Sequence, residues 1–116
     1  MNLDWDRFRS FFAADATVFF PPSANSPERS NNKQEVEAVF RTVFDNARKQ
    51  KSSPPYLKIQ PRDMRVQLLG DVAIVTFHLD DPDSTGRRTI VLRHQGRRWL
   101  IVHLHASGIS VKETRR

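Results

Sequence analysis

The chain has 116 residues, of which 38% are hydrophobic and 28% charged, and its formal net charge is +6. This length predicts a single domain over residues 1–116 with enough apolar surface to build a core, which argues against global disorder. The absence of cysteine excludes disulfides, thiolate nucleophiles and thiolate metal sites, and with a polar, acidic start and no apolar run of bilayer length it favours a cytoplasmic protein.

The positive charge raises nucleic-acid binding as an alternative, because proteins that bind DNA or RNA are commonly basic. The cations are scattered, however, as in Arg62 and Arg65 or Arg87 and Arg88, with acidic residues between them. The chain shows neither an aromatic-flanked basic motif nor a helix with a basic stripe. We therefore expect a solvated basic surface on a protein that binds neither nucleic acid nor membrane.

The first predicted elements are rich in aromatic residues. Trp5, Phe8 and Phe12 fall on one helical face, which predicts a short helix that presses aromatic rings onto a core. Residues 15–20 have the composition of a strand, and a Pro-Pro pair ends it. The segment 21–32 is rich in Ser, Asn and Pro and is predicted to be a loop.

The clearest periodicity lies in residues 33–49, where apolar residues recur at the spacing of one buried helical face. Asn32 is placed to cap this helix, and Glu35, three residues later, can reach back to the free backbone donors. The pair Pro54-Pro55 prevents the helix from continuing far. The predicted buried face consists of Val36, Val39, Phe40, Val43, Phe44 and Ala47.

Four strand candidates follow, at residues 63–69, 72–79, 87–94 and 98–109, joined by turns at 70–71, 80–86 and 95–97. Such short connections predict an antiparallel meander. The second and fourth candidates are apolar or aromatic on both faces, which indicates that both sides of the sheet are covered. Helices can cover only one side, so we expect a partner subunit on the other.

The order of these features resembles the SnoaL-like branch of the nuclear transport factor 2-like superfamily. The resemblance rests on Trp5-x-x-Phe8, on Phe12-Ala-Ala-Asp15-Ala-Thr-Val-Phe-Phe-Pro21, on the long helix and on Trp99-Leu-Ile-Val-His-Leu-His-Ala-Ser-Gly108. The last strand is most similar to the association (hub) domain of calcium/calmodulin-dependent protein kinase II, which carries Trp, Ile-Val-His-x-His and Ser-Gly there. The resemblance implies an α+β, cystatin-like fold, in which a cone of curved antiparallel sheet packed on helices encloses a pocket and dimerises through its outer face.

Members of this superfamily usually begin with a long helix before the position of Trp5, and four residues precede Trp5 in this chain. We therefore expect an abbreviated N-terminal helix, with either a more open pocket or a start that is internal to a longer protein.

The resemblance also offers an enzyme as the alternative function. In the related ketosteroid isomerases, the general base is an Asp just before the Pro that ends the first strand. Phe20 occupies that place here, so we assign no catalytic residue to an isomerase, cyclase or hydratase. Tyr56 either lines the pocket mouth or serves in packing.

Kinase hub domains place arginines in the cone, and aligning the strands by their turns puts the counterparts near Leu79, Thr89 and Ala106, all uncharged. We therefore expect a pocket for a small neutral apolar molecule and no cofactor, unless these side chains simply fill the core. The predicted pocket residues are Phe20, Tyr56, Val75, Phe77, Leu79, Thr89, Leu104 and Ala106.

His103 and His105 are two residues apart on one strand, and His78 is expected on the same face of a neighbouring strand, a spacing that can surround a zinc ion. The competing interpretation is hydrogen bonding between subunits, because the resembling hub domains keep His-x-His without a metal. The predicted interface consists of His78, Trp99, Ile101, His103 and His105. The sequence thus predicts a homodimer or larger ring that works as a small-molecule-binding or assembly domain.

Overall fold

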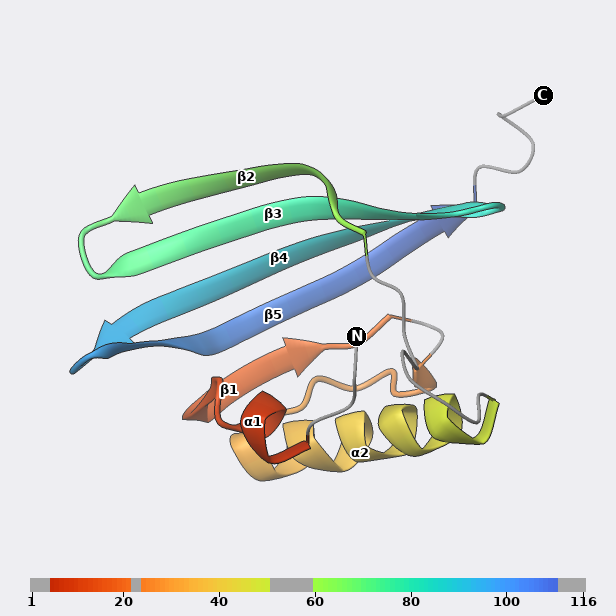
Figure 1. Ribbon diagram of the computed structural model, residues 1–116, viewed down its shortest axis with the longest axis horizontal. Helices are drawn as coiled ribbons and strands as arrows, with labels where there is room; N and C mark the ends of the chain where they lie inside the picture. Colours follow the sequence, from red (N-terminus) through yellow and green to blue (C-terminus); the bar gives the residue numbers. More distant parts are fainter. Residues whose placement is uncertain (1–4, 22–23, 51–59, 111–116) are drawn as a thin grey trace.

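The computed structural model describes residues 5–21, 24–50 and 60–110. The elements are α1 (Trp5–Arg9), β1 (Phe12–Phe19), α2 (Lys33–Gln50), β2 (Arg62–Leu69), β3 (Val72–Asp81), β4 (Ser84–Gln95) and β5 (Arg98–Ser110). The strands form one open sheet in the order β1-β5-β4-β3-β2, with both helices near its β1 edge (Figure 1). The predicted α+β class and curved sheet packed on helices are confirmed. Within the described ranges, no helix is long and apolar enough to cross a membrane.

Strands β2 to β5 form the predicted antiparallel meander, and each turn between them has two residues. Gly70 and Gly96 take positive φ angles of 66° and 62°, the left-handed conformation that tight turns favour and glycine adopts without steric cost. The predicted seven-residue turn at 80–86 is wrong: Asp81 pairs with Ser84, so the turn is Pro82-Asp83. The turn-forming composition of this segment hid strand residues that pair across the ladder.

The sheet is mixed, which the purely antiparallel prediction missed. β1 runs parallel to β5, with Thr17 opposite His103 and Phe19 opposite His105. A parallel pair needs a long connection, and α2 with three further strands lies between β1 and β5 in the chain. β1 also begins at Phe12 rather than at residue 15, because it already pairs there with Ile101.

Helix α2 begins where its capping residues place it. The backbone N–H of Glu35 donates to Asn32 Oδ1 at 2.9 Å, and Glu35 Oε1 accepts from the backbone N–H of Asn31 at 2.9 Å. This reciprocal arrangement satisfies donors that would otherwise lack partners in the first turn. Phe44 and Val36 are 3% and 0% exposed, so the predicted buried face does point into the protein.

The buried core lies between β1 and α2. Phe12, Ala16 and Val18 of β1 pack with Val36 of α2, and Ile101 of β5 packs against this cluster, as do Phe8, Phe20, Phe40 and Leu104. We call the sheet face that meets α2 the inner face and the opposite one the outer face. Because side chains alternate along a strand, the pairing registers then assign every other strand residue to a face.

A β-bulge in β5 interrupts that alternation. Val91 pairs with His103 while the next residue, Leu92, pairs with Ile101, so Val102 is one extra residue on β5. Ile101 and Leu104, three positions apart, consequently both pack against the core. Without the bulge they would lie on opposite faces.

Candidate functional site

The side chains of the outer face form rows that run across the sheet, and each strand contributes one side chain to each row. One row runs through Gln67, Ile74, Val91, His103 and Thr17, and the next through Arg65, Thr76, Thr89, His105 and Phe19. Neither helix covers this face, since both pack on the inner one. The strands therefore present a band of β-branched, histidine and aromatic side chains of the kind that a sheet-to-sheet contact buries.

The histidines of β5 are held in place by β1. Thr17 Oγ1 and His103 Nδ1 form a hydrogen bond of 2.7 Å. The ring of Phe19 lies 6.0 Å from that of His103 and 5.4 Å from that of His105. Burial lowers the pKa of His103, and the neighbouring His105 and Arg29 lower it further, against the opposing effect of the Thr17 hydrogen bond. The lowered pKa favours the neutral form of the His103 imidazole in its hydrogen bond with Thr17.

The predicted interface residues do not all share one face. His78, His103 and His105 lie on the outer face. Ile101 packs against the core, and Trp99, two residues before it, lies on the inner side, where its ring contacts His94 at 4.9 Å. The bulge at Val102 is the physical reason, because it reverses the alternation between Ile101 and His103.

The three outer histidines do not converge on a point. His78 is on β3 and the other two are on β5, with β4 between them, so the strands that carry them are about 10 Å apart. The expectation of neighbouring strands is wrong. Across the described ranges no group of three or more His, Asp or Glu side chains is arranged to hold a metal ion.

The inner face carries most of the predicted pocket residues. Val75, Phe77 and Leu79 lie on it from β3, facing Ile90, Arg88 and Gly86 of β4, and Leu104 and Ala106 lie on it from β5. Phe20 packs into the core with its ring 4.9 Å from that of Phe40. Tyr56 lies outside the described residues.

Two adjacent residues correct the predicted pocket chemistry. Thr89 pairs with Thr76 and His105, which places it on the outer face. Its neighbour Arg88 lies on the inner face instead, opposite Phe77 and Ala106. The alignment by turns was one residue out of register here, so the inner face is not uncharged as predicted.

Gly86 makes room for the Arg88 side chain. Gly86 and Gly108 face each other across β4 and β5. A Cβ atom at Gly86 would lie 3.2 Å from Arg88 Nη1 and 3.1 Å from the carbonyl oxygen of Leu79. Arg88 Nη1 donates to the carbonyl oxygen of Ser107 at 3.2 Å, so the guanidinium group lies against the sheet.

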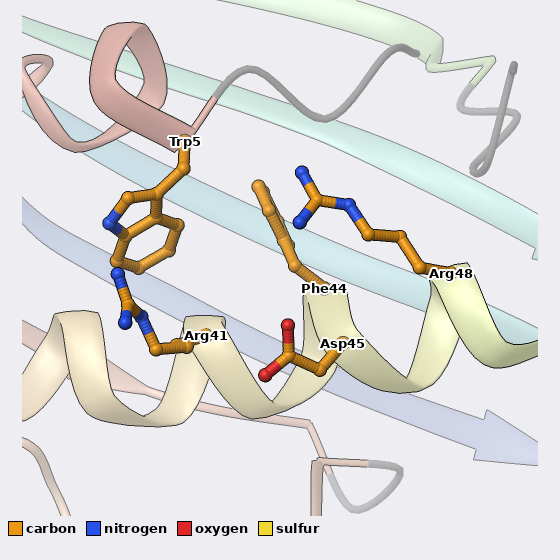
Figure 2. Close-up of a pocket in the computed structure, with 5 residues that line it drawn as sticks. All are labelled: Trp5, Arg41, Phe44, Asp45 and Arg48. Carbon is orange, nitrogen blue, oxygen red and sulfur yellow. The ribbon is translucent and has the colours of Figure 1, made fainter.

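A cavity of about 200 Å³ lies in a different place, between α1 and α2. It is lined by Trp5, Arg41, Phe44, Asp45 and Arg48 and shares no residue with the predicted pocket (Figure 2). The guanidinium carbon of Arg41 stands 5.0 Å from the centre of the Trp5 ring, and Phe44 meets that ring edge-on at 5.6 Å. Arg48 belongs to the cations that the sequence predicted to be solvated surface, although its seven-residue spacing from Arg41 places both arginines on one side of α2.

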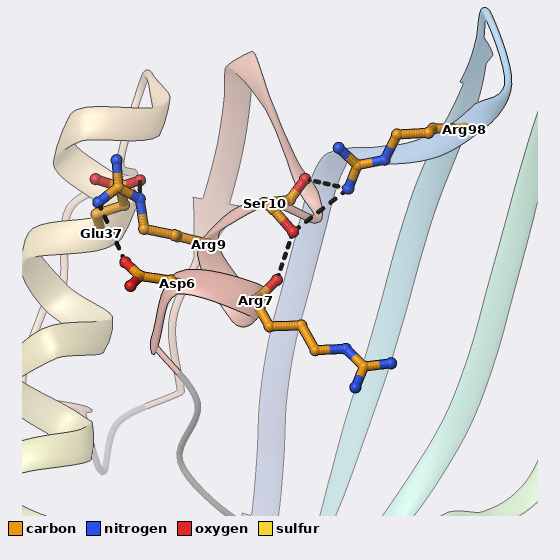
Figure 3. Close-up of polar contacts among 6 residues, drawn as sticks. All are labelled: Asp6, Arg7, Arg9, Ser10, Glu37 and Arg98. Carbon is orange, nitrogen blue, oxygen red and sulfur yellow. Dashed lines mark hydrogen bonds and ion pairs between the residues drawn. The ribbon is translucent and has the colours of Figure 1, made fainter.

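Polar contacts fix α1 and hence the position of Trp5. Arg9 Nε lies 3.3 Å from Glu37 Oε1 of α2, and Arg98 Nη2 of β5 donates to the carbonyl oxygen of Ser10 at 2.8 Å (Figure 3). Ser10 Oγ in turn donates to the carbonyl oxygen of Arg7 at 2.6 Å, which closes the end of the helix. This five-residue helix is therefore held to both α2 and the sheet.

Comparison with protein families agrees with this fold. The family model of the SnoaL-like domain matches residues 1–112. No curated protein matches the sequence.

Several solved structures are similar. The hub of calcium/calmodulin-dependent protein kinase II from S. rosetta is 24% identical, with a TM-score of 0.65, over 91% of this chain and 82% of that one. A protein from Streptomyces avermitilis, provisionally named a dehydratase of the nuclear transport factor 2-like family, is 18% identical, with a TM-score of 0.71 and the same two coverages. One from Parabacteroides distasonis, provisionally named a ketosteroid isomerase, is 21% identical, with a TM-score of 0.65, over 88% of this chain and 73% of that one.

Proposed function

Because this chain belongs to the SnoaL-like domain family, we propose that it works as a self-associating single domain that buries the outer sheet face between two copies and binds a small molecule on the inner face. The observation that carries the proposal is the outer face itself. Neither α1 nor α2 lies over its central residues Ile74, Val91 and Thr89, although their composition suits a buried sheet.

A second copy is the occupant that best matches this face. The two rows at its centre combine branched side chains with groups that both donate and accept hydrogen bonds, which is the chemistry of a self-complementary contact around a two-fold axis. Leu69, Ile109 and Phe19 at its margins are 60%, 49% and 37% exposed, so they add apolar area that contact would remove from water. The similarity to kinase hub structures supports the same assembly.

The inner face supplies the surface for a small molecule. Val66 and Leu68 of β2 are 56% and 69% exposed there, because α2 packs at the other edge of the sheet. Arg88 is the hydrogen-bond donor among apolar neighbours, so a mainly apolar molecule with one acceptor group fits this face better than a purely apolar one. No carboxylate lies among the β3–β5 residues that pair across the inner face from Ala73 to Leu79, and we propose no catalytic base.

Histidine footprinting tests the assembly. The chain has four histidines, and His105 on the outer face and His94 near the β4–β5 turn are both exposed in the subunit. We expect the rate of diethyl pyrocarbonate modification at His105 to fall as protein concentration rises, while the rate at His94 stays constant. Equal, concentration-independent rates at the two sites would contradict burial of the outer face.

A further inference from the structure

We propose that the outer face binds a phosphate-type oxyanion at Arg87, between His78 and His105, and that this anion strengthens the contact between two copies. Binding needs the residues of one subunit only, whereas the effect on assembly rests on the proposed function.

Arg87 lies between hydrogen-bonding side chains of both neighbouring strands, since β4 runs between β3 and β5 (Figure 1). It pairs with His78 on β3 and with Ser107 on β5, and His105 lies diagonally from it on β5. All four share the outer face with Thr89, which is two residues from Arg87 and pairs with His105. Cβ atoms of directly opposite residues are about 5 Å apart and those of diagonal ones about 7 Å, so an anion at the guanidinium group is within reach of both imidazoles.

The Arg87 guanidinium group is available for a ligand. The residue is exposed, and its side chain forms no hydrogen bond or ion pair with another residue in the ranges that the structure describes. The carboxylate of Asp80 lies diagonally from it on β3, but Arg62 holds that carboxylate, with Nε 2.6 Å from Oδ2 and Nη2 3.2 Å from Oδ1. Arg87 is therefore a positive charge that no described carboxylate pairs with.

His78 has an unused hydrogen-bonding atom beside Arg87. Its Nδ1 is buried and has no hydrogen-bond partner among the described residues. Such an atom has lost its hydration without gaining a protein partner, which native structures rarely tolerate. Rotation about the Cβ–Cγ bond, which is soft in histidine, lets the ring offer a nitrogen atom to an anion at Arg87.

These donors suit a tetrahedral anion better than a carboxylate. A carboxylate has two oxygens, which a single guanidinium group can satisfy. A phosphate has up to four, and donors come here from three strands: one guanidinium group, two imidazoles and the Ser107 hydroxyl. The spacing that keeps the histidines from sharing a metal ion fits a phosphate, because its own width and two hydrogen bonds of about 2.8 Å separate the donors.

A bound anion also favours assembly. Arg87 adjoins the central row of the outer face that contains Thr89. Burying it between two copies without a counter-charge is unfavourable, and a two-fold contact buries it in both copies. An anion at each Arg87 provides the missing negative charge, so the dimer should bind phosphate more tightly than the single subunit does. By linkage, phosphate then raises the association constant.

The test of binding uses inorganic phosphate as the probe, at fixed pH and with sodium chloride keeping the ionic strength constant. The reporters are the imidazole C–H signals of the four histidines, assigned by replacing each histidine with glutamine in turn. We expect saturable shifts of the His78 and His105 signals, half-complete at about 1–10 mM phosphate, and no shift of the His94 signal. The same shifts are expected in Val91→Asp, whose subunits should stay apart. Shifts that do not saturate, or that are equal at His94, would overturn the site.

Variants decide which group is responsible. Arg87→Gln should weaken phosphate binding about tenfold or more. Arg97→Gln is the matched control, because Arg97 is an exposed arginine in the turn at the far end of β4 and its loss changes the net charge equally. An equal loss in the two variants would overturn the proposal, and so would tighter binding of an oligothymidine than of free phosphate, which would reassign the site to nucleic acid.

Analytical ultracentrifugation at the same constant ionic strength tests the effect on assembly. Saturating phosphate should raise the association constant of the wild-type protein about tenfold and leave that of Arg87→Gln unchanged. A dimer whose association constant does not depend on phosphate would refute this proposal alone. A single chain under every condition would refute the proposed function as well.

Discussion

Replacing Val91 by Asp should separate the subunits while leaving each subunit folded. Val91 lies at the middle of the outer face, between Ile74 and His103, and is half-buried in the isolated chain. In the subunit, the new carboxylate keeps contact with water, so the cost is mainly the poor fit of Asp in a strand, about 1 kcal/mol. In the dimer, the same carboxylate is buried without a partner.

The size of the effect follows from the sheet. Its five strands are about 4.8 Å apart and β3 has 10 residues at about 3.3 Å each, so the flat footprint is roughly 600 Å². Because side chains project from the sheet, the buried area is larger than this flat footprint and comes close to the roughly 800 Å² per partner of a standard interface. An unpaired buried charge costs about 3 kcal/mol or more, and a two-fold interface contains it twice, so dimerisation should weaken by about ten-thousandfold or more.

Analytical ultracentrifugation over a range of concentrations measures this change. Val91→Thr, which preserves the branched shape, should remain associated, and Leu68→Asp, which places the same charge on the inner face, should also remain so. Circular dichroism checks that all three variants stay folded. A Val91→Asp protein with the wild-type association constant would refute the reasoning, and dissociation by Leu68→Asp alone would move the interface to the inner face.

Three further predictions concern stability. The lowered pKa of His103 means that the unfolded chain binds more protons below about pH 6.5, so the stability from this group is present above that pH and declines as the pH falls toward the folded pKa. Urea titrations should therefore show that the free energy of unfolding falls less between pH 7.5 and 5.5 in His103→Gln than in wild type or His94→Gln. Equal decreases in all three proteins would exclude this role of His103. Gly86→Ala should lower the free energy of unfolding by about 1–2 kcal/mol, because the added methyl group would lie 3.1 Å from the Leu79 carbonyl oxygen. An unchanged urea midpoint would show that the strand moves enough to accommodate the methyl group. Asn32→Ala removes the cap of α2 and should lower Tm by about 4 °C, from a loss of about 1 kcal/mol; an Asn32→Asp protein should retain most of that stability, and equal losses would argue against capping.

Local periodicity made most of the fold predictable. The apolar spacing of residues 33–49 and the cap at Asn32 identified α2 within one residue, because both depend on interactions inside the helix. The strand boundaries beside Gly70 and Gly96 followed in the same way from those two glycine turns, whereas the boundaries at the β3–β4 turn were displaced by two and three residues. The parallel pairing of β1 with β5 was not predictable, since it depends on contacts between residues about 86 positions apart.

The faces of the sheet were harder to predict, and a single residue shows why. The segment from Trp99 to His105 is apolar or aromatic at nearly every position, so no alternation marks the extra residue Val102. Trp99 and Ile101 were consequently grouped with His103 on one face. A one-residue error of register also explains why Thr89, and not Arg88, was predicted to face the pocket. The length assumed for the turn after β3 set the register of β4.

The α1–α2 cavity escaped prediction for another reason. Trp5 was recognised as a core residue and Arg48 as part of a solvated surface, and each description is correct by itself. Only the tertiary packing of a five-residue helix against α2 brings an aromatic floor and a charged rim together.

Native mass spectrometry of the wild-type protein at micromolar concentration is the most direct test of the central claim, that two copies bury the outer face of the sheet between them. The account predicts a mass of twice 13.5 kDa or a higher even multiple, and Val91→Asp should halve that mass, which for a dimer gives a single chain. A wild-type spectrum that contains the 13.5 kDa chain alone at every concentration would contradict it.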